Sequence, residues 1–545
     1  MSNFGLLNWA IVAAYLIANL LLGYMMSRKV KTASDFQLGT KTLPWWAIGI
    51  SVVATYVSAL SFLGGPAWAY GDGMAALAIH INYPLVIFVV VVLFLPFFFN
   101  SGVASIYEYL ERRFGPTSRS VMAILFLITQ TITTASILTA TAVVITFVTG
   151  VDISIAIVGM TLVVVVYTLM GGMNAVIWTD VLQGVILFIG AGIVLWGLLG
   201  AITPLSSALD TLAVDGKLNP INTDLDFSVA PTVWAGVFAM TLFHITVYGS
   251  NQMMVQRTLA ARNIGDAKKS YLLMGFGAFF IYFLFFFIGA LLYVHFEGRP
   301  FDEPNEIILV FAKSLAVPGL MGIIAAAVLS ASMSSLSSAL NSLATVSTAD
   351  FYQRFFRRDE SDLHYLWSTR VFTLIWALIA IPIAFAFVSS GGSILETLSA
   401  VGSYLVGAKL AMFGLGFLSK HTSERGLMVG VIAGFLAMLV ATTGFAPLGI
   451  APADIAWPWY VVVGGGVNII VSWGASILLD GFQEDWHEHT VPGQMRAFRE
   501  AGRAETENGW YLVPGRVDRI AWLLPVFFVG IVSFLMWFGT LGSAS

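Results

Sequence analysis

Cysteine is absent from the 545 residues of this chain. Its absence excludes disulfides, thiolate metal sites and a cysteine nucleophile. Charge is scarce as well, because only 10% of the residues are Asp, Glu, Lys or Arg, whereas soluble domains carry roughly 25%. With 58% hydrophobic residues, the composition predicts a protein whose solvent is lipid. The net charge of -4 gives no sign of a nucleic-acid partner.

Motifs of nucleotide hydrolysis and of common hydrolases are missing too. The sequence contains no phosphate-binding loop of the Walker type, no HExxH and no GxSxG. We therefore expect no enzymatic activity, and an ion gradient is the favoured energy source.

The chain does contain a long series of apolar segments of about 20 residues, the length that crosses a bilayer. We predict an all-α integral membrane protein whose fourteen spans are 6–27, 45–66, 74–99, 119–149, 152–171, 174–203, 231–256, 270–297, 316–350, 364–389, 392–419, 424–446, 457–480 and 520–541. The first span is not followed by a small-residue cleavage site, so we expect it to be a mature helix.

The orientation follows from the Lys and Arg residues of alternate loops. With the N-terminus outside, the predicted inner loops, Arg257 among them, contain 22 of the 26 basic residues, and the outer loops contain three. This asymmetry predicts a multi-pass protein of a plasma membrane of the bacterial inner-membrane type, with both termini outside. The lipid bilayer is its expected partner, and no obligate protein partner is evident.

The fourteen spans can be grouped as one, five, five and three. Two consecutive blocks of five cross the membrane in opposite directions, as inverted-repeat transporters require. The predicted divisions are an extra N-terminal helix with its inner loop (1–44), a first repeat (45–203), an outer loop (204–230), a second repeat (231–419) and three further helices with an inner loop at 481–519 (420–545).

The first helix of each repeat is expected to be broken. Residues 53–66 are rich in β-branched and hydroxyl side chains before a Gly-Gly-Pro sequence, and residues 243–252 are polar around a central glycine. Free backbone carbonyls are tolerated at membrane depth where they line a cavity or bind a ligand. Close packing of small residues is the alternative explanation of both segments.

Several motifs occur in a characteristic order between residue 40 and about residue 430. They are LPWWA (43–47), SIYEYLERRF (105–114), YTLMGG (167–172), AVIWTDVLQ (175–183), NQ followed by QR (251–257), and LNS followed by DFY (340–352). In these motifs the chain resembles the sodium:solute symporter family, which includes sodium/glucose, sodium/proline, sodium/iodide, monocarboxylate, multivitamin and sialic acid transporters. The resemblance implies the inverted-repeat fold of the bacterial leucine transporter and sodium-coupled uptake by alternating access.

A serine-rich face of the ninth span is the strongest candidate for a sodium site. Ala331, Ser334, Ser335 and Ser338 are spaced i, i+3, i+4 and i+7, which places them on one helical face. Carried over from the family, the main site consists of the carbonyls of Ala54, Val57 and Ala331 and the hydroxyls of Ser334 and Ser335. Helix packing is the alternative role of these serines.

A second sodium site, found in some family members, matches at Asp180, Ser334, Ser337 and Ser338. A carboxylate inside a span is costly unless it is paired or binds an ion. Asp180 is therefore expected either to hold a second ion or to accept hydrogen bonds near the inner interface.

The family's solute site implies a lining of seven residues here. They are Tyr56, Ser58, Ser61, His80, His244, Tyr248 and Ser399. The histidines and Ser61 replace the polar residues of galactose-type members, and Thr133 stands where sialic acid members have an arginine.

The two histidines and Lys409 are the candidates for receiving an anion. A histidine within a span commonly has only a packing role, and the alternative role of Lys409 is to extend its amine toward the interface. We expect both imidazoles to line the solute cavity, because their apolar neighbours offer few hydrogen-bond partners. A small organic anion is the leading substrate; a neutral sugar, polyol or amino acid is the alternative. A sensor would require a further domain after residue 480, and a channel would conduct sodium without solute.

Overall fold

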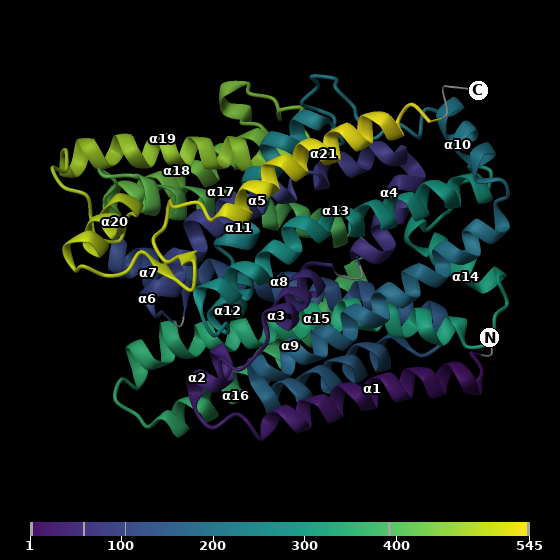
Figure 1. Cartoon of the computed structure of the whole chain (residues 1–545), viewed down its shortest axis with the longest axis horizontal. Helices are drawn as coiled ribbons and strands as arrows, with labels where there is room; N and C mark the ends of the chain where they lie inside the picture. The colour runs from purple at the N-terminus through teal and green to yellow at the C-terminus, as the bar shows by residue number, and fades with distance from the viewer. Residues whose placement is uncertain (1–3, 58–59, 104, 391–393, 542–545) are drawn as a thin grey trace.

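The computed structural model describes residues 4–57, 60–103, 105–390 and 394–541, and this part of the chain is mostly helical. The long helices are α1 (Leu6–Ser27), α8 (Pro116–Thr149), α9 (Ile153–Ala201), α13 (Ile264–His295), α15 (Leu320–Val346), α16 (Asp362–Ser390), α17 (Ile394–Leu418), α18 (Glu424–Thr443), α19 (Tyr460–Asp480) and α21 (Leu523–Phe538). They run mostly along the long axis of the molecule, and the two termini lie at the same end (Figure 1).

Shorter elements connect or continue these helices. The short α-helices are α2 (Ala33–Leu38), α3 (Trp45–Tyr56), α4 (Gly65–Asp72), α5 (Tyr83–Val89), α6 (Leu95–Ser101), α7 (Ile106–Arg113), α10 (Leu205–Val214), α11 (Met240–Gly249), α12 (Gln252–Leu259), α14 (Ile307–Ser314) and α20 (Val491–Glu500). Turns of π-helix are η1 (Leu60–Gly64), η3 (Val90–Phe94), η4 (Ala235–Ala239) and η6 (Ser347–Phe356). Turns of 3-10 helix are η2 (Gly73–His80), η5 (Pro304–Glu306), η7 (Ala446–Leu448), η8 (Trp457–Trp459) and η9 (Arg519–Trp522). Strands β1 (Thr506–Glu507) and β2 (Trp510–Tyr511) form an antiparallel hairpin.

The described residues include ten helical stretches that are long and apolar enough to cross a membrane. One of them, α9, has 49 residues, enough for two crossings of about 20 residues each. The breaks of α3 and α11 leave segments shorter than full spans. The protein is a multi-helix membrane protein, and the count of fourteen crossings stays a prediction.

Helix α9 reverses at Gly172, the last residue of the YTLMGG motif. Gly172 has φ 51° and ψ -142°, a conformation that side chains with a Cβ disfavour. A Cβ here would also lie 2.5 Å from the Phe36 carbonyl oxygen. The motif therefore ends in glycine for a steric reason, and the reversal falls between the predicted spans 152–171 and 174–203.

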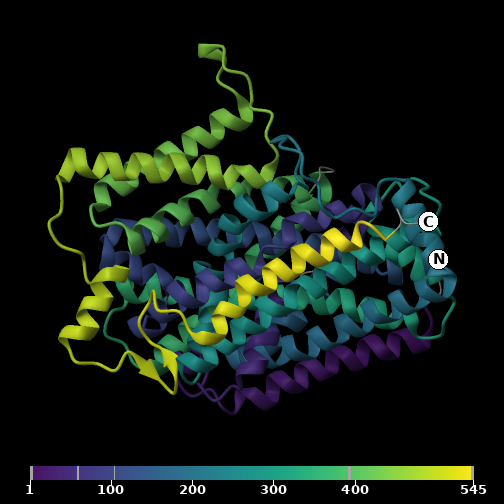
Figure 2. The same cartoon turned by 45° about the horizontal axis from the view of Figure 1, so that its top comes forward.

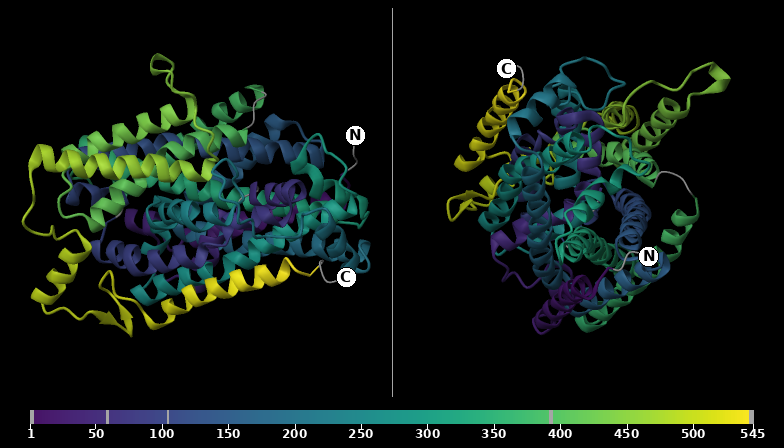
Figure 3. Two further views of the ribbon diagram at one scale, coloured as in Figure 1. Left: turned by 90° about the horizontal axis from the view of Figure 1, so that it is seen from above. Right: turned by 90° about the vertical axis from the view of Figure 1, so that its right-hand side faces the viewer.

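Helix α15 lies at the centre of the bundle. It contacts α1, α3, α8, α9 and α16, and its residues from Ile324 to Val346 are all buried. The end-on view shows it enclosed by its neighbours (Figure 3). Hydroxyl groups on a helix in this position meet protein rather than lipid. The serines of α15 can therefore form hydrogen bonds with the neighbouring helices.

Helices α17, α18 and α19 form one flank, and α1 lies on the opposite flank (Figures 1 and 3). Small residues bring α18 and α19 together, because a Cβ on Gly430 would lie 1.9 Å from the Ser472 hydroxyl. The segment that joins these two helices stands clear of the bundle (Figure 2).

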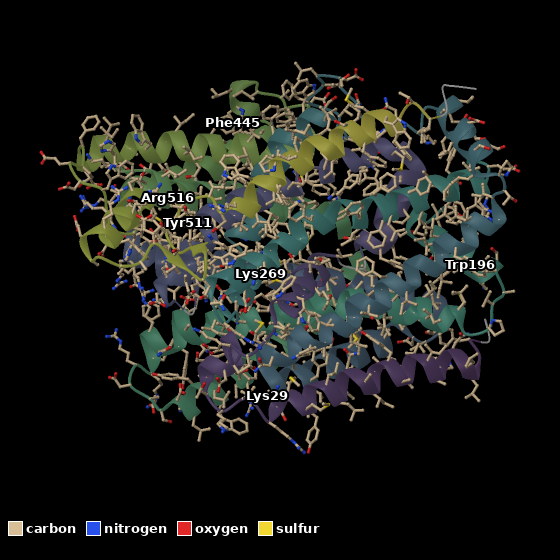
Figure 4. The ribbon with its side chains drawn as sticks, in the orientation of Figure 1. Lys29, Trp196, Lys269, Phe445, Tyr511 and Arg516 are labelled. Carbon is tan, nitrogen blue, oxygen red and sulfur yellow. The ribbon has the colours of Figure 1, made fainter. Side chains whose placement is uncertain are left out.

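The segment 481–519 is ordered against the bundle through α20 and the β hairpin. Buried Lys268 forms an ion pair with Asp518 at 2.5 Å and donates to the carbonyl of Tyr511 at 2.7 Å. Tyr511 and Arg516 lie in the left half of the view in Figure 4, and Trp196 lies near the opposite end. This segment therefore covers one end of the bundle.

Candidate functional site

Helix α3 ends inside the bundle, as its sequence predicts. The Val57 amide donates to the Val53 carbonyl at 3.0 Å, and Val57 then leaves the helical conformation at φ -77° and ψ 85°. Ser58 lies outside the described residues. The break frees the carbonyls of the last turn of α3 to accept hydrogen bonds from other groups.

Two of these carbonyls accept hydrogen bonds from the serine face of α15. The Ser334 hydroxyl donates to the Ala54 carbonyl at 2.8 Å, and the Ser335 hydroxyl donates to the Thr55 carbonyl at 3.0 Å. Both hydroxyls also lie within 3.4 Å of the Ala331 carbonyl. The structure thus brings together four of the five residues predicted for the main sodium site, with Val57 buried at the adjoining break.

This arrangement contains the ligand types that a hard cation requires, since carbonyl and hydroxyl oxygens converge without a net negative charge. Each serine hydroxyl can turn its hydrogen away and present a lone pair to an ion. The Thr55 carbonyl is an addition to the residues predicted from the sequence. The Ala54 carbonyl was predicted as a ligand from the resemblance to the family. The pairing of Thr55 with Ser335 could not be predicted, because it depends on how far α15 is rotated relative to α3.

Asp180 lies in the second half of α9 and is completely buried. Its Oδ2 accepts hydrogen bonds from the Ser51 hydroxyl and, at 3.0 Å, from Nη2 of Arg257. The Thr55 hydroxyl lies 3.4 Å from the same oxygen. The other oxygen, Oδ1, has no hydrogen-bond partner in the described part of the chain. Asp180 is therefore paired with a cation but retains one unused acceptor.

The position of Arg257 corrects the sequence analysis, which placed it in an inner loop. Its side chain is fully buried, because α12 resumes after the break at residues 250–251 and returns it to the interior. Nε donates to Ser51 at 2.8 Å, Nη1 donates to the Met253 carbonyl at 2.6 Å, and Nη2 also donates to the Ser338 hydroxyl. Arg257 therefore joins Asp180 to Ser338. The carboxylate of Asp180 inside a predicted span requires a cation, and this requirement could have indicated that an arginine is buried beside it.

The two remaining serines of the predicted second site are bonded to their own helix. Ser337 and Ser338 both donate to the Ser334 carbonyl, at 3.2 and 2.6 Å. Ser338 additionally reaches Arg257 and, at 3.4 Å, the Thr55 hydroxyl. The predicted second site is thus contiguous with the main one through Ser334 and Thr55.

Four of the residues predicted to bind solute, Tyr56, His80, His244 and Tyr248, meet in one cluster with Tyr83 and Tyr282. The His80 and Tyr282 rings stack at 3.8 Å, and the Tyr83 and His244 rings lie 4.8 Å apart. Tyr56 contacts Tyr248 at 5.3 Å. We call these six residues the aromatic cluster. It joins α3, η2, α5, α11 and α13, and Ser61 interacts with its Tyr282 hydroxyl.

Both histidines have hydrogen-bond partners, although the apolar residues around them in the sequence were expected to offer few. His244 is buried with Nδ1 3.0 Å from Oδ1 of Asn82 and Nε2 3.0 Å from the Tyr56 hydroxyl. His80 has Nδ1 3.2 Å from the Tyr83 hydroxyl. The partners of His244 come from distant segments, so the sequence around it does not reveal them, whereas Tyr83 lies only three residues after His80. The one buried hydroxyl of the cluster without a described partner is that of Tyr248.

The structure does not test three further residues that were predicted to bind the solute or its charge. The side chain of Ser399 on α17 lies outside the described residues, as does all of Ser58. Lys409 is half-buried on the same helix. Its role in binding an anion therefore stays a prediction.

Comparisons with known proteins agree with this architecture. The family model of the sodium:solute symporter family matches residues 36–434. The sodium-coupled monocarboxylate transporter 2 of Bos taurus is 29% identical over 469 residues, which cover 84% of this chain and 76% of that protein. The sodium/sialic acid symporter SiaT of Proteus mirabilis is 29% identical over 491 residues, covering 87% of this chain and 95% of that one.

A solved structure shares the fold. The substrate-bound, outward-open structure of a sodium-coupled sialic acid symporter superimposes with a TM-score of 0.81 at 27% identity, covering 88% of this chain and all of that one. These findings confirm the resemblance found in the motifs and establish sodium as the co-transported ion. The protein is a multi-pass membrane transporter and not an enzyme, and it belongs to the sodium:solute symporter family.

Proposed function

We propose that this protein imports a small organic anion together with sodium by alternating access. The observation that carries the proposal is the position of two consecutive residues at the end of α3. The Thr55 carbonyl accepts from Ser335 beside the predicted sodium site, and the Tyr56 hydroxyl bonds to His244 in the aromatic cluster. A shift of this one turn of helix changes both sites together, which is what coupling requires.

The predicted repeats, 45–203 and 231–419, give this movement a framework. Each begins with a helix that is interrupted within the bundle, α3 after Tyr56 and α11 after Gly249. In α11 the break is followed by Asn251, whose side chain accepts from the Met253 amide and starts α12. We propose that the two repeats rock against each other about these breaks.

An organic anion suits the chemistry of the cluster. Tyrosine hydroxyls and imidazole nitrogens donate hydrogen bonds to a carboxylate, while the ring faces pack against the carbon skeleton. Relatives that transport monocarboxylates and sialic acid support a carboxylate substrate. The described members of the cluster include no lysine or arginine, which favours a substrate with a single charge.

The test is uptake into proteoliposomes with an imposed sodium gradient. The panel contains radiolabelled short monocarboxylates, sialic acid, glucose, a polyol and neutral amino acids. We expect sodium-dependent uptake of a monocarboxylate, blocked when potassium replaces sodium. Sodium-dependent uptake of only neutral solutes would overturn the anion assignment, and sodium conductance without solute would overturn symport.

The second sodium ion gives a stoichiometric prediction. The Oδ1 of Asp180 has no partner among the described residues, while Oδ2 of the same carboxylate is contacted by the hydroxyls of Ser51 and Thr55. A buried acceptor without a partner is costly unless something binds it. We therefore expect reversal potentials of the reconstituted protein to give two sodium ions per solute. A ratio of one would refute the second site and leave the main site unaffected.

The aromatic cluster predicts a selective loss of solute affinity. His244→Ala removes hydrogen bonds to Asn82 and Tyr56 and opens the wall of the cluster. If the imidazole also donates to the solute carboxylate, the loss of that bond to a charged group, about 1.5–3 kcal/mol, corresponds to about a 10- to 100-fold rise in the solute concentration for half-maximal uptake.

The matched control is His295→Ala, which alters a histidine at the end of α13, outside the cluster. The concentration of sodium for half-maximal uptake is expected to change much less than that of solute. If His244→Ala kept the solute affinity of the wild type, the assignment of the aromatic cluster to the solute site would be wrong.

A further inference from the structure

An apolar cavity of about 700 Å³ lies between α11, α17 and α19. Its walls include Leu242, Leu410, Leu415, Val461, Ile469 and Trp473. None of its lining residues belongs to the sites described above. Most of its lining residues come from α17 and α19, which lie on the flank described above (Figures 1 and 3).

Glycines explain both the contact between the two helices and the space beside it. A Cβ on Gly407 of α17 would lie 2.7 Å from the Gly465 amide nitrogen of α19, so the backbones meet closely there. Gly414 and Gly466 line the cavity, and a Cβ on either would meet no atom within 4 Å. Helices α17 and α19 are thus in contact at Gly407 and Gly465, whereas the space beside Gly414 and Gly466 is open.

The dimensions fit an acyl chain. The lining of α19 extends from Val461 to Trp473, or about 18 Å at 1.5 Å per residue. One leaflet of a bilayer contributes about half of the ~30 Å hydrocarbon core. Trp473 has 47% of its surface exposed, and Leu418 has 58%. These exposed apolar side chains place the cavity at the lipid boundary.

One end of the cavity is polar and basic. Ser419, Lys420 and His421 line it together with Trp486. The Gln483 amide donates to Nδ1 of His421 at 3.1 Å, so a neutral ring carries its proton on Nε2 and can donate from there. Tryptophan is enriched at the level of lipid headgroups, and Trp473 and Trp486 both line the cavity.

Two of the nearby acids have partners. Asp480 accepts from the Ser423 hydroxyl at 2.5 Å and lies 3.7 Å from Arg425, and Asp485 lies 3.6 Å from Arg496. Lys420 takes part in none of the ion pairs found within the described ranges. A cation at the mouth of an apolar groove is complementary to a phosphate attached to a hydrocarbon chain.

We propose that this cavity binds an anionic glycerophospholipid from the surrounding bilayer. One acyl chain lies along α19 past Gly414 and Gly466, and the phosphate binds Lys420 and His421. The site is on the side that the charge asymmetry predicts to be inner, where basic pockets between helices recognise anionic headgroups.

The test measures lipid-dependent stability of the full chain purified in detergent. Thermal unfolding is followed while phosphatidylglycerol or phosphatidylcholine with the same acyl chains is added. We expect phosphatidylglycerol to raise the melting temperature at lower concentrations than phosphatidylcholine. Lys420→Gln should weaken the apparent affinity for phosphatidylglycerol about fivefold, and Gly414→Phe or Gly466→Phe should remove the stabilisation by filling the groove.

Two matched variants separate this site from general effects of lipid. Gly474→Phe adds the same ring to α19 at a position that is also open but does not line the cavity. Lys29→Gln removes an exposed lysine at the end of α1, on the opposite flank. Both should respond to phosphatidylglycerol as the wild type does.

Three results would overturn the proposal. The first is equal stabilisation by the two lipids, which would show that the protein does not recognise the anionic headgroup. The second is an undiminished response of both Gly414→Phe and Gly466→Phe. The third is a dimer by light scattering that either phenylalanine variant dissociates, which would assign the cavity to a second copy of the chain.

Discussion

Replacing Ser334 or Ser335 by alanine is expected to raise the sodium concentration for half-maximal uptake by about tenfold. Each substitution removes one hydroxyl that meets a free carbonyl of α3, Ser334 at Ala54 and Ser335 at Thr55. A lost ligand to a cation corresponds to about 1.5–3 kcal/mol, and 1.4 kcal/mol is a factor of ten. Because alanine is the best helix former, α15 itself stays intact.

The measurement is initial uptake rate against sodium concentration at saturating solute. The double variant should show no saturation within the range of sodium that the wild type requires. Ser332→Ala is the matched control, since Ser332 is equally buried on α15 but its hydroxyl pairs with Thr141 on α8. Sodium dependence unchanged in both single variants, or changed as much in Ser332→Ala, would contradict the assignment of this face.

The serine face could be predicted because helical spacing and polarity are both local properties. Ala331, Ser334 and Ser335 share a face in any helix, and the break after Tyr56 follows from residues that weaken a helix. The reversal at Gly172 is likewise marked at one position, because its positive φ of 51° favours glycine. These features needed no knowledge of which helices are neighbours.

Other parts of the site depend on contacts between distant segments. Arg257 looked like a loop residue because hydropathy treats every arginine as exposed, yet it pairs with Asp180, which is 77 positions away. Tyr83 and Tyr282 have no special signal in an apolar span, and they join the aromatic cluster only through the packing of α5 and α13. The partners of His244 also come from α3 and from the residues before α5.

Arg257→Ala is expected to lower thermal stability and to abolish uptake. It leaves the Asp180 carboxylate buried without its cation and leaves Ser51 and Ser338 without their donor. Removing one partner of a buried ion pair typically costs about 3–5 kcal/mol. Folding is measured as the yield and melting temperature of the monodisperse protein in detergent. Arg262→Ala is the control, because Arg262 is exposed just beyond α12.

The double variant Asp180→Asn with Arg257→Gln distinguishes a role in folding from a role in ion binding. Removing both charges also removes the unpaired charge, so stability should recover well above that of Arg257→Ala. If Oδ1 of Asp180 holds a second ion, this stable double variant should still transport solute but with one sodium ion instead of two. Asp180→Asn alone cannot make this distinction, because it leaves the guanidinium of Arg257 buried without its counter-ion. A double variant as unstable as Arg257→Ala would contradict the electrostatic account of the pair. A stable double variant that kept a ratio of two would assign Asp180 a purely structural role and place the second ion elsewhere.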